Sequence, residues 1–538
     1  YEVYPRSFQD SNRDGIGDIK GIERRLGYLK SLGVDAIWIT PMYPSPQVDF
    51  GYDIADYEAI DPQYGTMGDF DTLLKTAKAE GIRVIMDIVL NHTSDQNPWF
   101  KESRSSRNNP KRDWYIWRDG KNGGPPNNWQ SWFGHSAWEL DPATGQYYYH
   151  YFYKQQPDLN WRNPEVRKAM YDVLRFWLDK GVSGFRMDAV SRLLEDPNLH
   201  DDPYLPGYNA FGDRNIRHLY TDDLQENHEI FKEIRRIADS YPNKPVLIAE
   251  ADEPDIASLS KMYGTHGDEV QLPMDFQIAD VNQLSAPRFR KVFAEVETNP
   301  AQGWPEYFLS NHDQVRSWER YAPTQTEAQR LQIAKLMAVL GLTPRGTFQM
   351  YYGEEIGMRT TEPKRKEDVR DPIGVTGWPK EKGRDGERTP MQWTPATPNA
   401  GFTPPDVRPW LPVPPSARTA NVETESAQPD SLLNFYKLLL RLRHTEPALL
   451  AGDYVGLTPD DPDVFSFERH IAPARGHSLV VALNMSATPH TVSLTPTGAT
   501  TASVHGTALA SNFERPGGEH NLHEVQLPAY GAIVLREE

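Results

Sequence analysis

The sequence predicts an α/β barrel with an inserted subdomain, followed by an all-β C-terminal domain. Over the first 90 residues, short apolar runs alternate with amphipathic segments, which is typical of βα units around a parallel sheet. Further on, three apolar runs end in an acidic residue, and strand ends are where barrel enzymes carry their catalytic groups. Beyond about Leu450, β-rich runs are separated by Pro, Gly and Thr. A length of 538 residues fits two or three domains.

Eight barrel strands are predicted from apolar runs bounded by turn residues. They are expected at residues 1–5, 34–40, 82–90, 184–188, 246–250, 270–276, 307–310 and 347–351. Apolar residues at helical spacing indicate the helices between them, and a glycine ends each of the first two. The clearest are Ile22, Leu26, Leu29 and Leu32 before Gly33; Phe70, Leu73, Leu74 and Ala77 before Gly81; and the segments 164–180, 229–240 and 432–443.

Two long polar segments interrupt the βα rhythm. Residues 93–161 hold polar loops and one short strand-like run, and a loop of that length inside a compact domain is expected to have structure of its own. Residues 357–407 form a second polar excursion, rich in Pro, Gly, Arg and Asp. We therefore predict a barrel over 1–92 and 162–450, an inserted subdomain over 93–161, and a C-terminal domain over 451–538.

Composition limits the binding partners and the cellular compartment that are expected for this protein. Lys and Arg number 57 against 75 Asp and Glu, and this net charge of −18 disfavours nucleic acid and anionic membranes as partners. The absence of cysteine excludes disulfides and thiolate metal sites. No apolar run approaches the roughly 20 residues of a membrane span. We expect a cytoplasmic protein that acts on small molecules, as a monomer or a homodimer.

Two of the strand-end acids have different predicted surroundings. Arg186 and Asp188 lie two apart on one strand, so they project to the same side, and the guanidinium is expected to lower the pKa of Asp188. Glu250 follows an apolar strand, and apolar surroundings are expected to raise its pKa. A charged carboxylate beside a protonated one suits a nucleophile and a general acid in sugar-bond cleavage. Each acid alone is also compatible with a structural strand-end role.

A third acid occurs in an Asn-His context that the chain repeats. His312 and Asp313 follow Asn311 after a predicted strand, and Asn91-His92 follows the strand that carries Asp87. Histidine can donate to sugar hydroxyls, and a carboxylate can accept from a pair of them. One strand-end histidine is often structural, whereas two in the same context favour a binding site.

A loop near the N-terminus has the spacing of a calcium-binding loop. Oxygen ligands are expected at positions 1, 3, 5 and 9, with a carbonyl at position 7 and glycine at position 6. The residues are Asp10, Asn12, Asp14, Asp18, the Ile16 carbonyl and Gly15. Position 12 is Gly21 instead of Glu, so the loop is not a full EF-hand. We predict a structural Ca²⁺ or Mg²⁺; the alternative is a polar turn without an ion.

These motifs together resemble a known family, the α-amylase family (glycoside hydrolase family 13), in its α-glucosidase and oligo-1,6-glucosidase branch. The resemblance covers essentially the whole chain. It is carried by YPRSFQDSN at 4–12, DIVLNH at 87–92, QPDLN at 156–160, GFRMD at 184–188, Glu250, NHD at 311–313 and RTPMQW at 388–393.

The resemblance implies a (β/α)8 TIM barrel, an inserted domain after strand 3 and a C-terminal β-sandwich. It also implies a retaining mechanism, in which the two reacting carboxyls lie about 5–5.5 Å apart. By analogy, Asp188 is the nucleophile, Glu250 is the acid/base, and Asp313 stabilises the transition state.

Further positions match the family's sugar-binding residues. The resemblance implies that the non-reducing glucose is held by Asp49, Tyr52, His92, Arg186 and His312. Arg388 matches an arginine that pairs with the counterpart of Asp49 and closes the pocket, which favours release of single glucose units. Phe152 resembles an aromatic residue on the acceptor side. The loop of Asp10, Asn12, Asp14, Ile16 and Asp18 matches the branch's single metal site.

The residue after the nucleophile bears on linkage. Members acting on α-1,6 bonds commonly carry Val there, whereas this chain has Ala189. The smaller side chain predicts α-1,4-linked, maltose-type substrates, with possible transfer to acceptor sugars.

Relatives with other functions share some or all of these motifs. An oligo-1,6-glucosidase, a sucrose isomerase or a transglucosylase would use the same three acids. The Arg-rich loop expected of a sucrose isomerase is not evident at 314–318. Non-catalytic relatives that serve membrane transporters need a membrane span and have lost catalytic acids, whereas this chain keeps all three.

Overall fold

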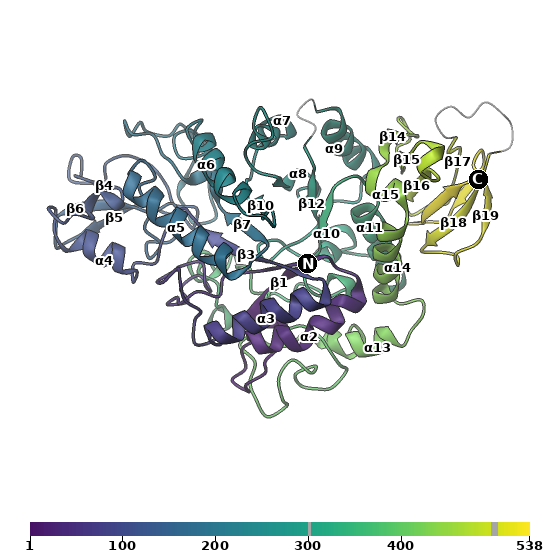
Figure 1. The fold of residues 1–538 in the computed structure, drawn as a ribbon, viewed down its shortest axis with the longest axis horizontal. Coiled ribbons are helices and arrows are strands. Elements are labelled where there is room, and N and C mark those ends of the chain that lie inside the picture. Colours follow the sequence, from purple (N-terminus) through teal and green to yellow (C-terminus); the bar gives the residue numbers. More distant parts are fainter. Residues whose placement is uncertain (300–302, 496–503) are drawn as a thin grey trace.

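The computed structural model describes residues 1–299, 303–495 and 504–538, and its centre is a parallel eight-stranded sheet (Figure 1). The strands follow chain order: β1 (Glu2–Val3), β2 (Ala36–Ile39), β3 (Arg83–Val89), β7 (Gly184–Asp188), β10 (Val246–Ala249), β11 (Leu272–Asp275), β12 (Glu306–Phe308) and β13 (Thr347–Gln349). The two ends of the sheet meet, because Glu2 N–H donates to the Met350 carbonyl at 2.7 Å and Tyr352 N–H donates to the Glu2 carbonyl at 3.1 Å. The predicted (β/α)8 barrel is confirmed, with every strand near its predicted place.

Helices surround the barrel, and most end as their sequences predict. Gly33 and Gly81 adopt positive φ values of 101° and 75° and end the first two long helices. The long helices are α2 (Ile19–Leu32), α3 (Met67–Glu80), α5 (Pro164–Lys180), α6 (Asn227–Asp239), α9 (Ala286–Thr298), α11 (Glu327–Leu342) and α14 (Leu432–Thr445). Short ones are α1 (Pro5–Phe8), α7 (Ile256–Leu259), α8 (Phe276–Ala279), α10 (Ser317–Tyr321), α12 (Pro372–Gly377), α13 (Val422–Ser426) and α15 (Pro447–Ala451).

Helix α11 shows why one long helix lacked a sequence signal. Its residues from Ile333 to Leu342 are all buried, including Lys335, so no polar face alternates with an apolar one. A helix buried on all sides lacks the period that marks an amphipathic helix. It is also one of the helices that lie near the C-terminal domain (Figure 1).

Apolar side chains fill the barrel below its carboxyl edge. Trp38, Ile85, Ile248, Met274 and Phe308 come from five different strands and form one buried cluster. The barrel is therefore a packed core, and the polar strand ends above it are free to build a site.

The inserted segment between β3 and β7 has its own small sheet. Helix α4 (Pro98–Ser105) precedes three antiparallel strands in the order β4-β6-β5: β4 (Trp117–Arg118), β5 (Trp138–Asp141) and β6 (Gln146–Tyr149). After β7, the strands β8 (Tyr204–Tyr208) and β9 (Arg214–Ile216) form a separate hairpin. The inserted sheet and the C-terminal domain lie at opposite ends of the long axis (Figure 1).

The C-terminal domain is built from antiparallel strands in two sheets. Six strands have the order β14-β15-β16-β21-β18-β19, and β17 pairs with β20. They are β14 (Asp453–Gly456), β15 (Val464–His470), β16 (Leu479–Asn484), β17 (His490–Val492), β18 (His505–Ser511), β19 (Glu519–Asn521), β20 (Val525–Leu527) and β21 (Ala532–Glu537). Side chains of both sheets share a second core that includes Val480, Val492 and Leu527. The predicted domain boundaries at 92/93, 161/162 and 450/451 stay predictions.

None of the helices that the described residues form has the length and apolar character to span a bilayer.

Candidate functional site

A cavity of about 580 Å³ opens at the carboxyl edge of the barrel. Asp188 ends β7, Glu250 directly follows β10, and Asp313 lies in the loop after β12. All three acids line this cavity. The structure therefore brings together the three acids that the sequence singled out. It also places six further predicted residues on the wall: Asp49, Tyr52, His92, Phe152, Ala189 and His312.

Arg186 connects two of the acids from below the cavity. Its guanidinium is fully buried; Nη1 donates to Asp188 Oδ1 at 2.6 Å, and Nη2 lies 2.9 Å from Glu250 Oε2. Nη1 also donates to Asp87 Oδ2 at 3.1 Å. The guanidinium stacks over the Trp38 ring, 4.7 Å from its centroid. One cation thus positions both carboxylates, and its shortest bond goes to Asp188.

The pKa values of these two acids differ from the predicted contrast. Burial raises the pKa of Asp188 to about 7, because the opposing pull of Arg186 does not offset the loss of water. Burial likewise raises the pKa of Glu250 to about 7, as predicted, again against Arg186. The lowered pKa predicted for Asp188 is wrong, because burial outweighs Arg186 and the nearby Asp87 carboxylate raises the pKa further. The two carboxyls interact, so their titrations belong to the pair.

Asp313 is the acid that stays ionised. Burial opposes its ionisation, but His312, Arg384 and Arg388 hold the pKa of Asp313 well below its usual range. The two arginines carry this effect at neutral pH, because burial lowers the pKa of His312 and leaves that ring uncharged. Asp313 Oδ1 accepts from Arg384 Nη1 and from Arg388 Nη2, both at 2.7 Å.

Glu2 fixes the ring of His312, a contact that sequence reasoning missed. His312 Nδ1 lies 2.7 Å from Glu2 Oε1, and Nε2 lies 2.8 Å from the Tyr52 hydroxyl. The Tyr52 and His312 rings stack with centroids 5.3 Å apart and planes within 5°. The only sequence signal for Glu2 was an acid inside a predicted barrel strand. Both ring nitrogens are thus engaged, and the imidazole is held rigidly at the cavity wall.

His92 is held in a similar way on the neighbouring wall. Its Nε2 lies 3.1 Å from the Tyr52 carbonyl and 3.1 Å from Gln156 Nε2. Burial lowers the pKa of His92 to about 3, so the ring is neutral. Gln156, which also donates to Asp49 Oδ2 at 3.2 Å, was part of the QPDLN motif but was not predicted to line the cavity.

The arginine that pairs with Asp49 is Arg384 and not Arg388, which corrects the sequence prediction. Arg384 Nη2 donates to Asp49 Oδ1 at 2.9 Å, and its Nε donates to Asp371 Oδ2 at 2.8 Å. Arg388 is buried, donates to the His312 carbonyl at 2.7 Å and does not line the cavity. The two arginines are four positions apart, and the fold places Arg384 on the wall and Arg388 behind it.

Ala189 and Phe152 occupy the remaining predicted positions on the wall. Ala189 has a positive φ of 46°, and its N–H donates to Glu250 Oε2 at 3.0 Å. Ala189 therefore orients Glu250 through its backbone and presents only a methyl group to the cavity. The Phe152 ring lies 5.2 Å from that of His92.

The predicted metal-binding loop keeps its oxygens close together through its own hydrogen bonds. Asp10 Oδ1 accepts from the N–H groups of Asn12 and Arg13 at 2.9 and 2.7 Å. Asp14 Oδ1 accepts from Ile16 N–H at 2.8 Å, and Asp18 Oδ1 accepts from Gly21 N–H at 2.7 Å. Across the described residues, no three His, Cys, Asp or Glu side chains converge as metal ligands do. Asp14 Oδ1 accepts one N–H and keeps a lone pair for a hard cation, whereas each Asp10 oxygen already accepts two donors, so Asp10 would have to exchange hydrogen bonds for an ion.

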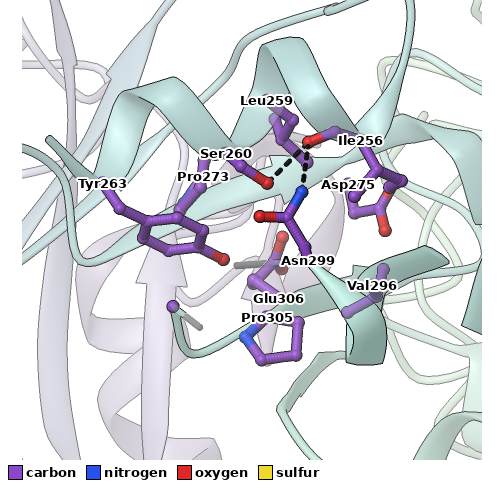
Figure 2. Close-up of a pocket in the computed structure, with 11 residues that line it drawn as sticks. Ile256, Leu259, Ser260, Tyr263, Pro273, Asp275, Val296, Asn299, Pro305 and Glu306 are labelled. Carbon is purple, nitrogen blue, oxygen red and sulfur yellow. Dashed lines mark hydrogen bonds between the residues drawn. The ribbon is translucent and has the colours of Figure 1, made fainter. Parts of the chain in front are cut away.

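A second, smaller cavity lies apart from the acids. It has a volume of about 20 Å³ and lies between α7, the end of α9 and the start of β12 (Figure 2). At its wall, Asn299 and Ser260 both donate to the Ile256 carbonyl, at 3.5 and 2.6 Å. That volume suits a water molecule and not a sugar.

The large cavity has the chemistry of glycoside cleavage. Two buried carboxyls share one guanidinium, and a third carboxylate is held ionised beside them. Retaining glycosidases need a nucleophile and an acid/base arranged around one bond. Neutral histidines and amides on the wall suit hydroxyl recognition.

Comparison with known proteins agrees with this chemistry. The family model "Alpha amylase, catalytic domain" matches residues 2–452. A probable alpha-glucosidase of Rhizobium meliloti (strain 1021) is 39% identical, over 100% of this chain and 96% of its own. An oligo-1,6-glucosidase of Parageobacillus thermoglucosidasius is 40% identical, over 90% of this chain and 89% of its own.

Solved structures show the same architecture along the whole chain. An alpha-glucosyl transfer enzyme has a TM-score of 0.90 at 38% identity, covering 100% of this chain and 98% of that one. The trehalulose synthase MutB from Pseudomonas mesoacidophila has a TM-score of 0.89 at 36% identity, with the same coverage. Family model, relatives and fold agree, and the chain belongs to the α-amylase family of glycoside hydrolases (glycoside hydrolase family 13), in its α-glucosidase branch.

Proposed function

We propose that this enzyme is a retaining, exo-acting α-glucosidase that releases glucose from the non-reducing end of short α-1,4-linked glucosides such as maltose. The observation that carries the proposal is the contact of one buried guanidinium, that of Arg186, with both Asp188 and Glu250. It places two carboxyls against one sugar-sized site, beside an ionised Asp313. Glycoside cleavage with retention uses a pair of carboxyls that flank one bond, and this pair fits that use.

The roles follow from the contacts of each acid. Asp188 Oδ2, which is free of the Arg186 bond to Oδ1, attacks the anomeric carbon and forms a glucosyl ester. Glu250 gives its proton to the leaving oxygen as the glycosidic bond breaks. In the second step the ester bond breaks as water or an acceptor hydroxyl bonds to the same carbon, and its proton returns to Glu250. Asp313, held ionised, stabilises the positive charge that develops on the ring.

The exo action is supported by the closed end of the cavity. Arg384 bonds to Asp49, Asp371 and Asp313 at once, so this wall is tied together by one residue. A chain that continued past the glucose would have to break these ion pairs. We therefore propose that single glucose units are released.

The linkage preference can be tested by glucose release from maltose and isomaltose measured in parallel. We expect faster release from maltose, because Ala189 leaves room beside Glu250. Ala189→Val should shift the ratio of the two kcat/KM values toward isomaltose by about tenfold, the effect of a small volume change in a binding pocket. A ratio that Val leaves unchanged, or wild-type preference for isomaltose, would contradict the role given to Ala189.

The stability of that variant needs its own measurement. Ala189 has a φ of 46°, where a β-branched residue is strained. Ala189→Val is expected to lose about 1–3 kcal/mol of unfolding free energy. Ala189→Ser, which tolerates this backbone better, is the matched control and should keep the wild-type ratio.

Transglucosylation is the second candidate activity. The same acids serve it, since only the acceptor of the second step differs. Two of the structural relatives are named as an alpha-glucosyl transfer enzyme and a trehalulose synthase, which favours testing transfer and sucrose isomerisation alongside hydrolysis. The products of sucrose incubation would separate these activities from simple hydrolysis.

We also propose a structural Ca²⁺ or Mg²⁺ in the loop of Asp10, Asn12, Asp14, Ile16 and Asp18. The support is an all-oxygen donor set, which hard cations prefer. Chelation with EDTA should lower Tm by a few degrees, because an ion bound only to the folded state adds stability. Asp14→Asn should show a lowered Tm that no longer responds to EDTA. An unchanged Tm together with no bound metal by elemental analysis would refute the site.

The remaining expectations concern cellular context. We propose that the enzyme acts in the cytoplasm on small α-glucosides, as a monomer or homodimer, without nucleic acid or membrane partners. The support is its net charge of −18 and its lack of cysteine.

A further inference from the structure

The hairpin of β8 and β9 has no part in the chemistry derived so far. It follows β7, the strand that ends at Asp188, and its strands are largely exposed; Tyr208 is 71% exposed. Its tip behaves differently, because Ala210 and Phe211 line the large cavity. The exposed hairpin therefore places one aromatic ring, that of Phe211, on the cavity wall.

The tip is fixed in place by polar contacts. Asn209 Oδ1 accepts from the N–H groups of Phe211 and Asp213, at 3.0 and 2.9 Å. Asp213 in turn accepts from His135 N–H at 2.8 Å, which ties the tip to the inserted segment. A second tie joins the same two segments, since Gln130 Nε2 donates to the Arg214 carbonyl at 2.8 Å. The ring of Phe211 thus lies on a turn that hydrogen bonds fix to the inserted segment.

Two glycines from distant segments make room for that ring. A Cβ on Gly134 would lie 2.4 Å from Phe211 Cγ, and one on Gly377 would lie 3.3 Å from Phe211 Cε1. Gly134 belongs to the inserted segment, and Gly377 ends α12. Three segments therefore meet at Phe211, and the ring has a specific slot.

The position relative to the acids indicates what Phe211 contacts. The glucose end of the cavity is closed by Arg384 and Asp49. Phe211 lines the same cavity as Asp188, Glu250 and Asp313, on the loop that follows β7. Its phenyl ring offers no group for proton transfer or ion pairing, so it is suited to contact a part of the substrate other than the reacting bond.

We propose that Phe211 is a specificity-determining residue that stacks on the group linked to the transferred glucose, either a second sugar ring or an aromatic aglycone. The inference rests on the proposed α-glucosidase function and assigns one side of that site. An aromatic face suits the apolar face of a sugar and an aryl group alike. Phe211 touches the substrate but takes no part in proton transfer or bond formation.

The test compares Phe211→Ala and Phe211→Leu with Tyr208→Ala, a matched aromatic-to-alanine change on the same hairpin that does not line the cavity. With p-nitrophenyl α-glucoside as donor and maltose as acceptor, the ratio of glucose transferred to glucose released is measured. KM for maltose and inhibition by 1-deoxynojirimycin, which occupies only the glucose position, are measured on the same samples. Leu keeps apolar volume without a ring, so it carries the test if Ala does not fold.

We expect both Phe211 variants to raise KM for maltose by roughly threefold to tenfold, the size of one aromatic contact. The transfer ratio should fall, the inhibition constant should stay within about twofold of wild type, and Tyr208→Ala should match wild type. Unchanged KM and transfer ratio would overturn the inference, as would an equal loss of inhibitor binding. A wild type that releases no glucose from any α-glucoside would instead contradict the proposed function.

Discussion

Replacing Asp188 by Asn should lower kcat for glucose release from maltose by about 10⁴-fold or more, the usual cost of removing a nucleophile. Asn keeps the shape of the side chain and can accept the hydrogen bond from Arg186, so the variant is expected to fold. It cannot form the glucosyl ester, because the amide has no nucleophilic oxygen. The measurement is the initial rate of glucose release, with a melting curve on the same sample.

A second variant separates loss of the nucleophile from loss of structure. Asp188→Ala opens space where an external anion can act, and azide should restore part of the rate. The product should be β-glucosyl azide, since azide attacks the face that Asp188 occupies in the wild type. Asp71→Asn, an exposed carboxylate on α3, is the control and should keep wild-type activity. Recovery of α-glucosyl azide, or substantial activity in Asp188→Asn, would contradict the assignment of the nucleophile.

The acids and the barrel were predictable because local sequence determines both. An apolar run followed by Asp or Glu places the acid at the carboxyl edge of a parallel strand, whatever the rest of the chain does. Asp188 and Glu250 follow this rule directly, and β7 has the predicted bounds. The pKa of Asp188 could not be predicted in the same way. It depends on how deeply tertiary packing buries the carboxyl and on the Asp87 carboxylate, which comes from another strand.

Contacts between loops that are distant in the sequence were the main features that could not be predicted. Arg384 and Arg388 lie four positions apart in one polar segment, and the neighbouring sequence does not indicate which of them faces the cavity. Tertiary packing determines the outcome, because Arg388 donates to the His312 carbonyl behind the cavity wall. The place of Phe211 on the cavity wall could not be predicted either, because Gly134 and Gly377, which make room for its ring, belong to two other segments.

Removing Arg384 should have the second largest effect on both stability and substrate binding. Its guanidinium bonds to Asp49, Asp313 and Asp371, so Arg384→Met leaves three carboxylates short of their main cation. Breaking a buried ion pair by deleting one partner costs about 3–5 kcal/mol, and this site is near that regime because the side chain is 14% exposed. We expect a clear fall in Tm and a rise in KM for maltose, since the end of the glucose site is no longer closed.

A double-mutant cycle decides which arginine pairs with Asp49. Unfolding free energies of Asp49→Asn, Arg384→Met and the double variant should give a coupling of about 1–3 kcal/mol, as expected for groups in direct contact. The same cycle with Arg388→Met should give a smaller coupling, because Arg388 bonds to His312 and Asp313 and acts on Asp49 only through space. Coupling of Asp49 to Arg388 in place of Arg384 would return the closing role to the residue that the motif first indicated. If the cycle instead favours Arg384, one side chain closes the end of the glucose site, because its guanidinium bonds to Asp49 and to Asp313 at the same time. Closure of the pocket, which gives exo specificity, and stabilisation of the transition state by Asp313 are then coupled through that guanidinium.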